Sequence, residues 1–404
     1  MSHVVVVGAG QAGAALVAKL RTEGFAGKIT LIGAEKVPPY QRPPLSKAYL
    51  LGEMAEERLY LRPAAFYADQ AIDLRLDTRV VAINPADKTI TLAGDGVVSY
   101  DDLALTVGAH PRTLPAKVGG MLDGVYGMRD LSDADAMSPA LVAGKHVLII
   151  GGGYIGLEAA AVAAKRGLKV TLVEMADRIL QRVAAPQTSD YFRALHRSHG
   201  VDIREGVGLD CLLGDDHVTG ARLTDGTTLN IDFAVVGVGI TPATILADSA
   251  GLSVDNGIVT DSHGRTSDPH IWAAGDCATC LFGGRQIRLE SVGNAIDQAE
   301  AVALNIMGRD QAYLPKPWFW SDQYDCKLQI AGLNAGYTDV YVRMGDAPGV
   351  QSHWYYNGDQ LLAVDAMNDP RNYMIGKRLI EAGRSPDPAL ITDPATDMKA
   401  LLKP

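Results

Sequence analysis

Two short glycine loops have the residue types and the spacing that could bind a dinucleotide. The first is Gly8-Ala9-Gly10-Gln11-Ala12-Gly13, and the second has Gly151, Gly153 and Gly156 within GGGYIGLEAA. In this pattern the first glycine permits a tight turn and the second lets the backbone approach a pyrophosphate. The third lets the following helix pack closely on the preceding strand. Because this spacing alone is a weak signal, the surrounding elements must decide what each loop does.

The residues around each loop predict a strand, a turn, a helix and a second strand. Apolar runs at 3–7 and 28–32 enclose a helical pattern at 14–22. The same order returns in the second loop, with strands at 146–150 and 170–174 and a helix at 157–165. Both stretches are therefore predicted βαβ units, and their separation indicates the repeat of a whole domain.

Three carboxylates stand where they could act on a bound nucleotide. Glu35 comes shortly after the second strand of the first unit and Glu174 ends the second strand of the other, where an acid accepts hydrogen bonds from ribose hydroxyls. Glu174 would accept from a free 2′-hydroxyl and repel a 2′-phosphate, which favours NADH over NADPH, although Arg178 nearby is a counter-signal. A solvated strand end is the alternative for Glu174. Glu158 lies in the first turn of the second helix, where the helix dipole alone also favours an acid.

Two dinucleotide sites in one chain suggest an internal electron relay. One site would hold a resident redox cofactor, and the other would bind a diffusible nicotinamide. FAD suits the resident role because a flavin accepts a hydride and can release single electrons, which a nicotinamide cannot do. The first loop is therefore predicted to hold FAD and the second to bind NADH.

Composition limits the class of protein. A chain of 404 residues is expected to form two or three domains, and its net charge of −10 disfavours nucleic acid or an anionic membrane as partner. No stretch is long enough for a membrane span, and MSHVVVVGAG leaves no room for a signal peptide before the first strand. Four cysteines in so long a chain favour a reducing compartment, so we expect a cytoplasmic protein.

The rest of the chain predicts two doubly wound domains and a third of another type. Short strand-like runs follow each βαβ unit, at 79–83, 89–92, 102–106, 202–205, 218–223 and 233–236. From residue 318 the pattern alternates in WFWSDQYDCKLQIAG, VYVRM, VQSHWYY and QLLAVDAM, which is typical of an antiparallel sheet. A helix at 371–382 and a Pro-rich, loosely held tail are expected to end the chain.

The order of further motifs resembles a known family. PPYQRPPLSKAYL follows the first loop, then come LTVGAHPR, GGGYIGLEAA, VVGVGITPAT, IWAAGDCA, LESVGNAIDQAEAVA and PWFWSDQY. This series is similar to the FAD-containing, NADH-dependent ferredoxin reductases of the putidaredoxin reductase and biphenyl dioxygenase ferredoxin reductase family, and to palustrisredoxin reductase among them. The likeness covers essentially the whole chain.

The resemblance implies an α/β, glutathione-reductase-like fold. It contains two Rossmann-type dinucleotide-binding domains, for FAD and NAD, and an α/β C-terminal domain with an antiparallel sheet. The implied segments are 1–110 for the first part of the FAD domain, 111–242 for the NAD domain, 243–317 for the second part of the FAD domain, and 318–404 for the C-terminal domain.

The family's site residues carry over to matching positions of this chain. Lys47 would place positive charge near the flavin, and Trp320 would lie beside the flavin ring. Glu158 would accept a hydrogen bond from the nicotinamide amide and would form an ion pair with Lys47. The implied FAD contacts are Gly8, Gly10, Ala12, Gly13, Ala34, Glu35, Arg42, Lys47, Val80, Arg129, Asp276, Val292 and Trp320. The implied NAD contacts are Gly151, Gly153, Tyr154, Ile155, Gly156, Glu158, Glu174, Val238 and Gly239.

Several of these positions have a plain structural alternative. Some relatives carry an aspartate where this chain has Ala34, so either Glu35 takes the ribose or the contact there is made by backbone only. Lys47 could cap a helix at the surface, Trp320 could be core, and Asp276 could be a turn aspartate. Arg129 could be a solvated charge.

Missing cysteines narrow the reaction. Residues 34–60 contain none, although disulfide reductases and NADH peroxidases keep a reactive cysteine there. We interpret the CxxC of Cys277 and Cys280 as structural and expect no metal site, with a redox or metal role for this pair as the alternative. The predicted function is hydride transfer from NADH to FAD, then single-electron transfers to a [2Fe–2S] ferredoxin that supplies a P450 or ring-hydroxylating oxygenase. An NADH oxidase or peroxide reductase, or a slow-turnover flavin-dependent binding protein, is the alternative.

Overall fold

The computed structural model describes residues 2–403, which cluster into two compact units. Unit 1 comprises the described residues of 1–41, 56–110 and 240–317, and unit 2 comprises those of 42–55, 111–239 and 318–404. The stretch 42–55, which carries Arg42 and Lys47, thus lies in unit 2 rather than with the rest of segment 1–110. Each unit has its own sheets and cores.

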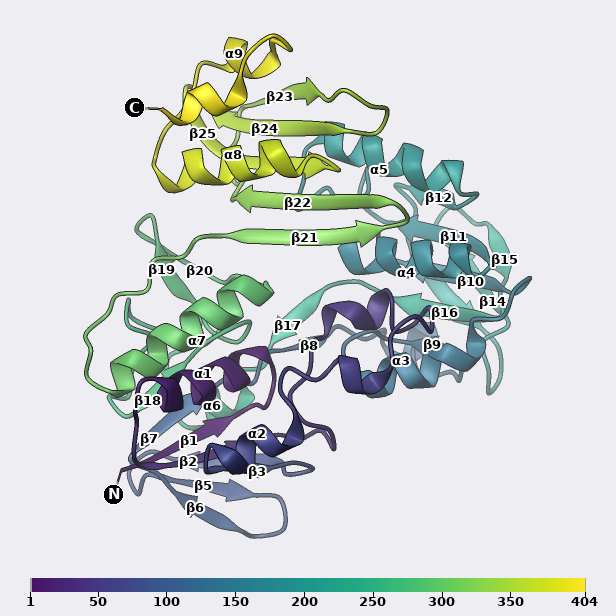
Figure 1. The fold of residues 1–404 in the computed structure, drawn as a ribbon. Helices are drawn as coiled ribbons and strands as arrows, with labels where there is room; N and C mark the ends of the chain where they lie inside the picture. The colour runs from purple at the N-terminus through teal and green to yellow at the C-terminus, as the bar shows by residue number, and fades with distance from the viewer. Residues whose placement is uncertain (1, 404) are drawn as a thin grey trace. The chain divides into compact units, whose positions relative to one another are not determined.

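A five-stranded parallel sheet forms the centre of unit 1. Its first strand is VVVV-rich and buried on both faces, as expected for a strand covered on each side. Val4 and Val6 pack against two helices that lie side by side, α1 (Gln11–Thr22) and α7 (Val292–Ile306) (Figure 1). The strand order is β18 (Ile271–Ala273), β7 (Asp102–Leu105), β1 (His3–Val7), β2 (Lys28–Ile32), β3 (Ile72–Arg75).

The other face of this sheet is covered by an antiparallel sheet. Val5 and Val7 of β1 pack there, because alternate residues of a strand point to opposite faces. The covering strands are β4 (Val80–Asn84), β5 (Thr89–Leu92) and β6 (Val97–Ser99). Unit 1 therefore has three layers: a layer of helices, the parallel sheet and the antiparallel sheet. The turn between β1 and α1 lies at the carboxyl edge of the parallel strands.

Unit 2 repeats this plan around the second glycine loop. The loop joins the central strand to α4 (Tyr154–Lys165), and an antiparallel three-stranded sheet packs against one face. The parallel order is β12 (Asp202–Glu205), β11 (Lys169–Glu174), β10 (His146–Ile150), β16 (Phe233–Val236), β9 (Val125–Tyr126). The covering strands are β13 (Leu209–Leu213), β14 (Gly220–Leu223) and β15 (Thr228–Asn230). The expected pair of βαβ units is confirmed.

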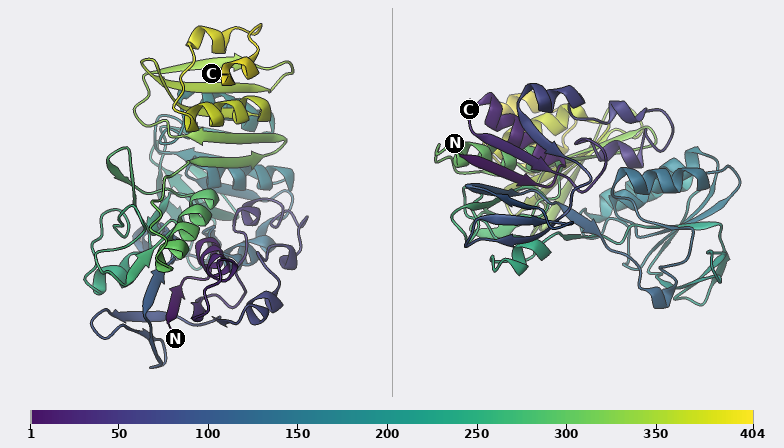
Figure 2. Two further views of the ribbon diagram at one scale, coloured as in Figure 1. Left: turned by 60° about the vertical axis from the view of Figure 1, so that its left-hand side comes forward. Right: turned by 90° about the horizontal axis from the view of Figure 1, so that it is seen from below.

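The antiparallel sheet expected near the C-terminus is also confirmed. Its strand order is β21 (Trp318–Gln323), β22 (Cys326–Gly332), β25 (Gln360–Met367), β24 (Gln351–Asn357), β23 (Asp339–Met344). Helix α8 (Pro370–Glu381) lies on one face of this sheet (Figure 2). Within unit 2, β21 also packs against α4.

A buried polar cluster joins the C-terminal sheet to α5 (Pro186–Ser198). The Thr188 hydroxyl donates to Asp365 Oδ2 at 2.8 Å, and Tyr355 donates to the same oxygen. His353 Nδ1 lies 2.7 Å from Thr188 Oγ1. Burial raises the pKa of Asp365 to about 6 and lowers that of His353 to about 4. The cluster holds the C-terminal sheet against α5 by contacts that no sequence motif predicts.

The prediction of a loosely held tail is wrong. The tail forms α9 (Pro388–Thr392) and a 3-10 turn at Met398–Leu402. The Arg343 guanidinium donates to the carbonyl of Ile391 at 2.9 Å and to that of Asp393 at 2.7 Å. A single guanidinium with five donors can hold several carbonyls of a Pro-rich segment, and composition does not show that.

Both helices that follow the glycine loops begin earlier than predicted. α1 begins at Gln11 rather than at 14, and α4 begins at Tyr154 rather than at 157, because glycines and alanines mask the apolar pattern in the first turn. The shorter elements are α2 (Ala64–Asp69), α3 (Leu131–Met137), α6 (Ile245–Ser249), β8 (Ala109–Pro111), β17 (Ile240–Pro242), β19 (Cys280–Phe282), β20 (Arg285–Ile287) and a 3-10 turn at Pro43–Ser46. Across residues 2–403, none of the helices has the length and apolar character needed to span a bilayer.

Candidate functional site

The first glycine loop has one open position between two crowded ones. Gly8 has φ +109°, and a Cβ there would overlap the carbonyl oxygen of Thr106. A Cβ on Gly13 would overlap the carbonyl oxygen of Gly8. A Cβ on Gly10 would have no atom within 4 Å. The outer glycines are thus required by the fold, while the middle one leaves free space at the N-terminus of α1, where a phosphate is favoured.

The second loop has the same division of roles. Gly151 has φ +107°, and a Cβ there would overlap the carbonyl oxygen of Gly237, while one on Gly156 would overlap that of Gly151. A Cβ on Gly153 would have no atom within 4 Å. Both loops therefore fit a pyrophosphate held against the start of a helix, which is the feature a dinucleotide cofactor needs.

The acid after β2 is held in place by a tyrosine. Tyr40 donates its hydroxyl hydrogen to Glu35 Oε2 at 2.6 Å, and the Glu35 carbonyl accepts from the Asp77 amide at 2.9 Å. Ala34 is exposed. The side chain of Glu35 is therefore ordered at the carboxyl end of β2, where a ribose-binding acid belongs.

A second part of unit 1 comes close to the start of α1. Gly275 has φ +81°, and a Cβ on it would lie 3.1 Å from the Cβ of Ala12. The amide of Gly275 donates to Gln298 Oε1 at 2.9 Å. The small residues of AAGD thus let Asp276, which is partly exposed, follow directly beside the first glycine loop.

The remaining predicted residues of unit 1 occupy element starts. Val292 is the first residue of α7, whose N-cap Ser291 accepts a hydrogen bond from the Asn294 amide. Val80 is the first residue of β4 and is buried. Neither side chain has a polar atom, so each can contribute only a backbone or an apolar contact to a cofactor.

The basic residues around PPLSK lie within unit 2. Arg42 and Lys47 flank the 3-10 turn at Pro43–Ser46, and Arg42 Nη1 donates to the carbonyl of Arg129 at 3.0 Å. The Arg129 amide in turn donates to Asp133 Oδ2 at 2.8 Å, within the capping box of α3. The structure thus brings Arg42 and the backbone of Arg129 together, as two parts of one predicted FAD contact set.

Glu158 is the most densely bonded acid of the site. Its Oε2 lies 2.7 Å from Lys47 Nζ and accepts from the Ser46 hydroxyl at 2.6 Å. Its Oε1 accepts from the Ser321 hydroxyl at 2.6 Å. The Glu158 side chain is only 5% exposed, so a charge there depends on these three donors. The ion pair with Lys47 that the resemblance implied is present.

Sequence reasoning missed Ser46 and Ser321. Ser46 stands beside Lys47 in the PPLSK motif, so its position was available. Ser321 follows Trp320 on β21, and successive strand residues point to opposite faces. The strand pattern therefore could have indicated a polar residue facing away from Trp320, but not that it reaches Glu158.

Aromatic side chains gather on α4 and β21 of unit 2. The rings of Tyr154 and Phe319 lie 4.9 Å apart, and Trp320 stacks on Trp318 at 5.4 Å with 21° between the planes. The Tyr154 hydroxyl is buried and has no hydrogen-bond partner among the described residues, and burial raises its pKa well above the ordinary value. Ile155, the next predicted NAD contact, is 39% exposed at the N-terminus of α4.

Glu174 is fixed beside the second glycine loop. Its carboxylate accepts from the Gly152 amide at 2.7 Å and from the Ala176 amide at 2.8 Å. Arg178 Nη1 instead donates to the Ser189 hydroxyl at 2.6 Å, so this guanidinium is already used within the protein. The position of Glu174 and the bond of Arg178 to Ser189 therefore weaken the argument that Arg178 binds a 2′-phosphate.

Val238 and Gly239 follow β16 at the same carboxyl edge as the second loop. Gly239 has φ +102°, and its carbonyl accepts from the Arg112 amide at 2.9 Å. The carboxyl edge of a parallel sheet is where such folds bind nucleotides. Val238 and Gly239 therefore lie at this edge, close to Gly151 of the second loop.

The CxxC cysteines are buried and free. Cys277 Sγ lies 3.4 Å from the carbonyl oxygens of Leu105 and Ala274, and Cys280 packs against Ala301 and Tyr313. Burial raises the pKa of each thiol to about 11. A thiol so far from ionisation is a poor nucleophile, which agrees with a structural interpretation.

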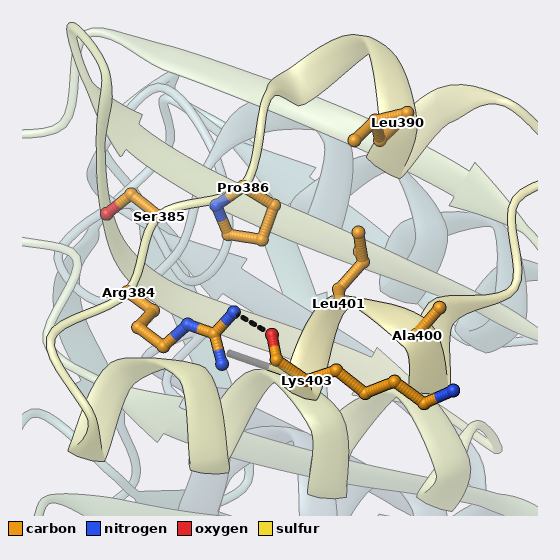
Figure 3. A pocket seen from close by; sticks show the side chains of 7 residues that line it. All are labelled: Arg384, Ser385, Pro386, Leu390, Ala400, Leu401 and Lys403. Atoms are coloured by element: carbon orange, nitrogen blue, oxygen red, sulfur yellow. Dashed lines mark hydrogen bonds between the residues drawn. The ribbon is translucent and has the colours of Figure 1, made fainter.

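A separate cavity of about 260 Å³ lies near the C-terminus (Figure 3). Arg384 Nη1 donates to the carbonyl of Leu402 at 2.9 Å, and Nη2 donates to that of Lys403, so the guanidinium holds the last turn of the chain. None of the predicted site residues lines this cavity. Its lining residues are Arg384, Ser385, Pro386, Leu390, Ala400, Leu401 and Lys403.

Two family models match the chain. Residues 2–299 match pyridine nucleotide-disulphide oxidoreductase, and residues 318–402 match the reductase C-terminal model. A ferredoxin–NAD(P)(+) reductase of a Sphingomonas species is 44% identical, over 99% of this chain and 98% of its own length.

Solved structures agree with these matches. The covalent putidaredoxin reductase–putidaredoxin complex has a TM-score of 0.96 and 40% identity, over 99% of this chain and 98% of that chain. The ferredoxin reductase for the CYP199A2 system from Rhodopseudomonas palustris has a TM-score of 0.96 and 39% identity, with both chains fully covered. The chain belongs to the pyridine nucleotide-disulphide oxidoreductase family and, within it, to the ferredoxin reductases, which are flavoprotein oxidoreductases that use FAD and NAD(P)H.

Proposed function

We propose that this enzyme oxidises NADH and reduces a [2Fe–2S] ferredoxin that supplies a P450 or ring-hydroxylating oxygenase. The observation that carries the proposal is the ion pair of the buried Glu158 with Lys47, at 2.7 Å, on the helix of the second glycine loop. Relatives named as ferredoxin reductases, and the solved covalent complex of putidaredoxin reductase with putidaredoxin, support the choice of partner.

The resident cofactor in this proposal is FAD. When bound, FAD takes two electrons from NADH and passes them on singly, so that each NADH reduces two ferredoxins and one proton is released. Gly10 leaves room for the pyrophosphate, and Glu35 or the backbone near Ala34 takes the ribose. The other contacts proposed are Gly8, Ala12, Gly13, Arg42, Val80, Arg129, Asp276, Val292 and Trp320.

NADH is the proposed nicotinamide, in preference to NADPH. Glu174 holds a carboxylate beside Gly152 at the ribose position, where it accepts from a 2′-hydroxyl and repels a 2′-phosphate. Arg178, which could have attracted that phosphate, bonds to Ser189 instead. The proposed contacts around this nucleotide are Gly151, Gly153, Tyr154, Ile155, Gly156, Val238 and Gly239.

Lys47 and Glu158 are the proposed catalytic residues, together with Trp320. Lys47 places a positive charge that stabilises added negative charge on the flavin. Glu158 accepts from the nicotinamide amide and so fixes the ring for transfer, which is a matter of orientation rather than of acid–base chemistry. Trp320, whose ring stacks on Trp318, offers a flat apolar surface to the flavin.

A route through a thiol is disfavoured. An NADH peroxidase or a disulfide reductase needs a thiolate, and burial raises the pKa of Cys277, Cys280 and Cys326 to about 11. We also propose a cytoplasmic location, which the four free cysteines support. The division into FAD segments 1–110 and 243–317, NAD segment 111–242 and C-terminal segment 318–404 is proposed with it.

Anaerobic titration tests this function. The purified protein should show the visible absorbance of FAD, which stoichiometric NADH should bleach and added oxidised [2Fe–2S] ferredoxin should restore. NADPH, added as the matched control, should bleach far more slowly. A protein that is colourless and does not bind FAD, or flavin that stays reduced when ferredoxin is added, would overturn the proposal.

A further inference from the structure

A line of hydrogen bonds, buried except for the last, runs from Glu158 to Tyr324 within unit 2. Ser321 Oγ lies 2.6 Å from Glu158 Oε1, and Gln323 Nε2 lies 3.1 Å from Ser321 Oγ. His196 Nε2 lies 2.8 Å from Gln323 Oε1, and Tyr324 Oη lies 3.2 Å from His196 Nδ1. We name these four residues the Glu158 chain: Ser321, Gln323, His196 and Tyr324.

Strand alternation explains why two of its members face the same way. Ser321 and Gln323 are two residues apart on β21, so both point to the face opposite Trp320. His196 comes from α5, which packs against this part of the sheet within unit 2. Ser321, Gln323 and His196 are each at most 1% exposed, so water cannot replace their bonds.

The direction of every bond in the chain follows from its first member. An ionised carboxylate only accepts, so Ser321 must donate its hydroxyl hydrogen to Glu158. The Ser321 oxygen is then left to accept from the Gln323 amide nitrogen, and this turns Gln323 Oε1 toward His196. Because Oε1 only accepts, His196 must carry its hydrogen on Nε2, and Nδ1 must accept from Tyr324.

Two further features agree with this arrangement. Burial lowers the pKa of His196 to about 4, so the ring is neutral near pH 7 and can donate from one nitrogen while accepting at the other. Tyr324 has φ +57°, an uncommon conformation for a bulky residue, at the two-residue turn between β21 and β22. Its ring stacks on His199 at 3.7 Å, which helps to hold it there.

We propose that the Glu158 chain is a positioning device, which keeps the Glu158 carboxylate oriented toward the nicotinamide through the Ser321 hydroxyl. The proposal rests on the role given to Glu158 above. Every donor in the chain points toward Glu158, and aligned hydrogen bonds of this kind strengthen one another in a low-dielectric interior. Ser46 and Lys47 bind the other oxygen, so the chain alone fixes Oε1.

The chain orients Glu158 and does not conduct protons. A relay would require each member to accept a proton on one side and release one on the other. The Gln323 amide would have to become an imidic acid to do so, whereas as an ordinary amide it transmits only direction. We therefore expect the chain to affect the orientation of the Glu158 carboxylate and the rate of flavin reduction, and to move no proton.

The direction of the bonds is tested by nuclear magnetic resonance of ¹⁵N-histidine-labelled holoprotein. The signals of His196, among nine histidines, are assigned with the His196→Asn variant. We expect Nε2 protonated and Nδ1 unprotonated near pH 7. A hydrogen on Nδ1 would mean that Ser321 does not donate to Glu158, and it would overturn the inference without reference to activity.

The effect on Glu158 is tested by stopped flow with Ser321→Ala. Loss of a hydrogen bond to a charged group is expected to lower the limiting rate of flavin reduction by NADH about tenfold. The dissociation constant for NAD⁺ should change less than about threefold, because uniform loss of binding is not expected. Gln323→Met should give a smaller decrease and Tyr324→Phe the smallest, since they act through more bonds.

Ser352→Ala is the matched control. Ser352 is a fully buried serine on β24 of the same sheet, and its hydroxyl accepts from Trp354 Nε1 at 3.1 Å. It should leave the reduction rate unchanged. A decrease equal to that of Ser321→Ala would assign the effect to damage of the sheet and would overturn the inference.

A double-mutant cycle separates this inference from the proposed function. In a Glu158→Gln background, Ser321→Ala should cause no further decrease if it acts through Glu158. If Glu158→Gln slows reduction and Ser321→Ala does not, the Glu158 chain has no positioning role but that of Glu158 stands. If Glu158→Gln leaves the rate unchanged, the role of Glu158 fails and the inference fails with it.

Discussion

At the residue scale, each oxygen of the two acids Glu158 and Glu174 accepts at least one hydrogen bond from the protein. The largely buried Glu158 carboxylate is bound by a lysine and two serines, and that of Glu174 is bound by two backbone amides. An acid with such donors is held in one rotamer, which is what an orienting contact to a nucleotide needs. Both acids could be selected from the sequence because Glu158 follows a glycine loop and Glu174 ends a strand of a βαβ unit.

Glu174→Ala tests the nucleotide choice at this scale. Removing the carboxylate removes both the acceptor for a 2′-hydroxyl and the repulsion of a 2′-phosphate. The ratio of kcat/KM for NADH to that for NADPH should fall by about tenfold, the size of one charged hydrogen bond. Steady-state kinetics with both nucleotides measures it.

Arg178→Ala is the companion of that variant. Its guanidinium bonds to Ser189, so its loss should not alter the ratio in either direction. An unchanged ratio in Glu174→Ala would remove Glu174 from the site. A ratio that rises in Arg178→Ala would show that this arginine binds NADPH after all.

At the scale of elements, each glycine loop divides into positions that the fold needs and one that a ligand needs. Gly156→Ala would force a methyl against the Gly151 carbonyl, so the free energy of unfolding should fall by about 1–3 kcal/mol. Gly153 has φ −80° in open space, so Gly153→Ala should fold normally. The same methyl would occupy the approach of the pyrophosphate, and NAD⁺ should bind about tenfold more weakly, or ~1.4 kcal/mol.

Chemical unfolding and calorimetric titration separate the two glycines. Chemical unfolding should show a loss of stability only in Gly156→Ala. Calorimetric titration should show weaker NAD⁺ binding in Gly153→Ala, whose stability is unchanged. Equal stability losses, or normal NAD⁺ binding by Gly153→Ala, would contradict the assignment of the loop.

The contact of α5 with the β21–β22 hairpin makes stability depend on pH. The pKa of His196 is about 4 in the folded chain because of burial and about 6.5 in an unfolded chain. Between those values the unfolded state binds the proton more tightly, so the stability from a neutral His196 is complete above pH 6.5 and is lost as pH falls toward 4. The loss is at most about 3 kcal/mol.

Denaturant midpoints of the wild type and His196→Asn at several pH values between 7 and 4 measure this term. The difference in unfolding free energy between the two proteins should shrink on acidification, since asparagine does not titrate. A difference that stays constant over this range would show that His196 is not buried as a neutral ring. His353, with its pKa also lowered to about 4, is unchanged in both proteins.

At the scale of the whole molecule, the sequence predicted the regular part of the fold and missed what single side chains do at a distance. Apolar runs such as VVVV and VLII predicted β1 and β10 because buried parallel strands are uniformly apolar. The tail held by Arg343 could not be predicted, because its partners are carbonyl groups that every residue has. Ser321 was missed for a related reason: its role depends on α4 and β21 meeting, and those elements are far apart in the chain.

The candidate site shows the same limit. The Lys47–Glu158 pair was available because both residues lie in motifs of the family. His196 lies in no motif, and although Tyr324 ends the motif PWFWSDQY, its bond to His196 depends on the packing of α5 against a hairpin. The ion pair between motif residues was therefore predictable, while the hydrogen bonds that hold Glu158 from behind were not.

The most direct test of the central claim is NADH-driven reduction of cytochrome c with and without a [2Fe–2S] ferredoxin. The account predicts a rate that rises with ferredoxin concentration and saturates, with two cytochromes reduced per NADH. Iodoacetamide treatment should not lower this rate, since the cysteines with raised pKa are not part of the route. Oxygen or peroxide consumption at a comparable rate without ferredoxin would contradict the account.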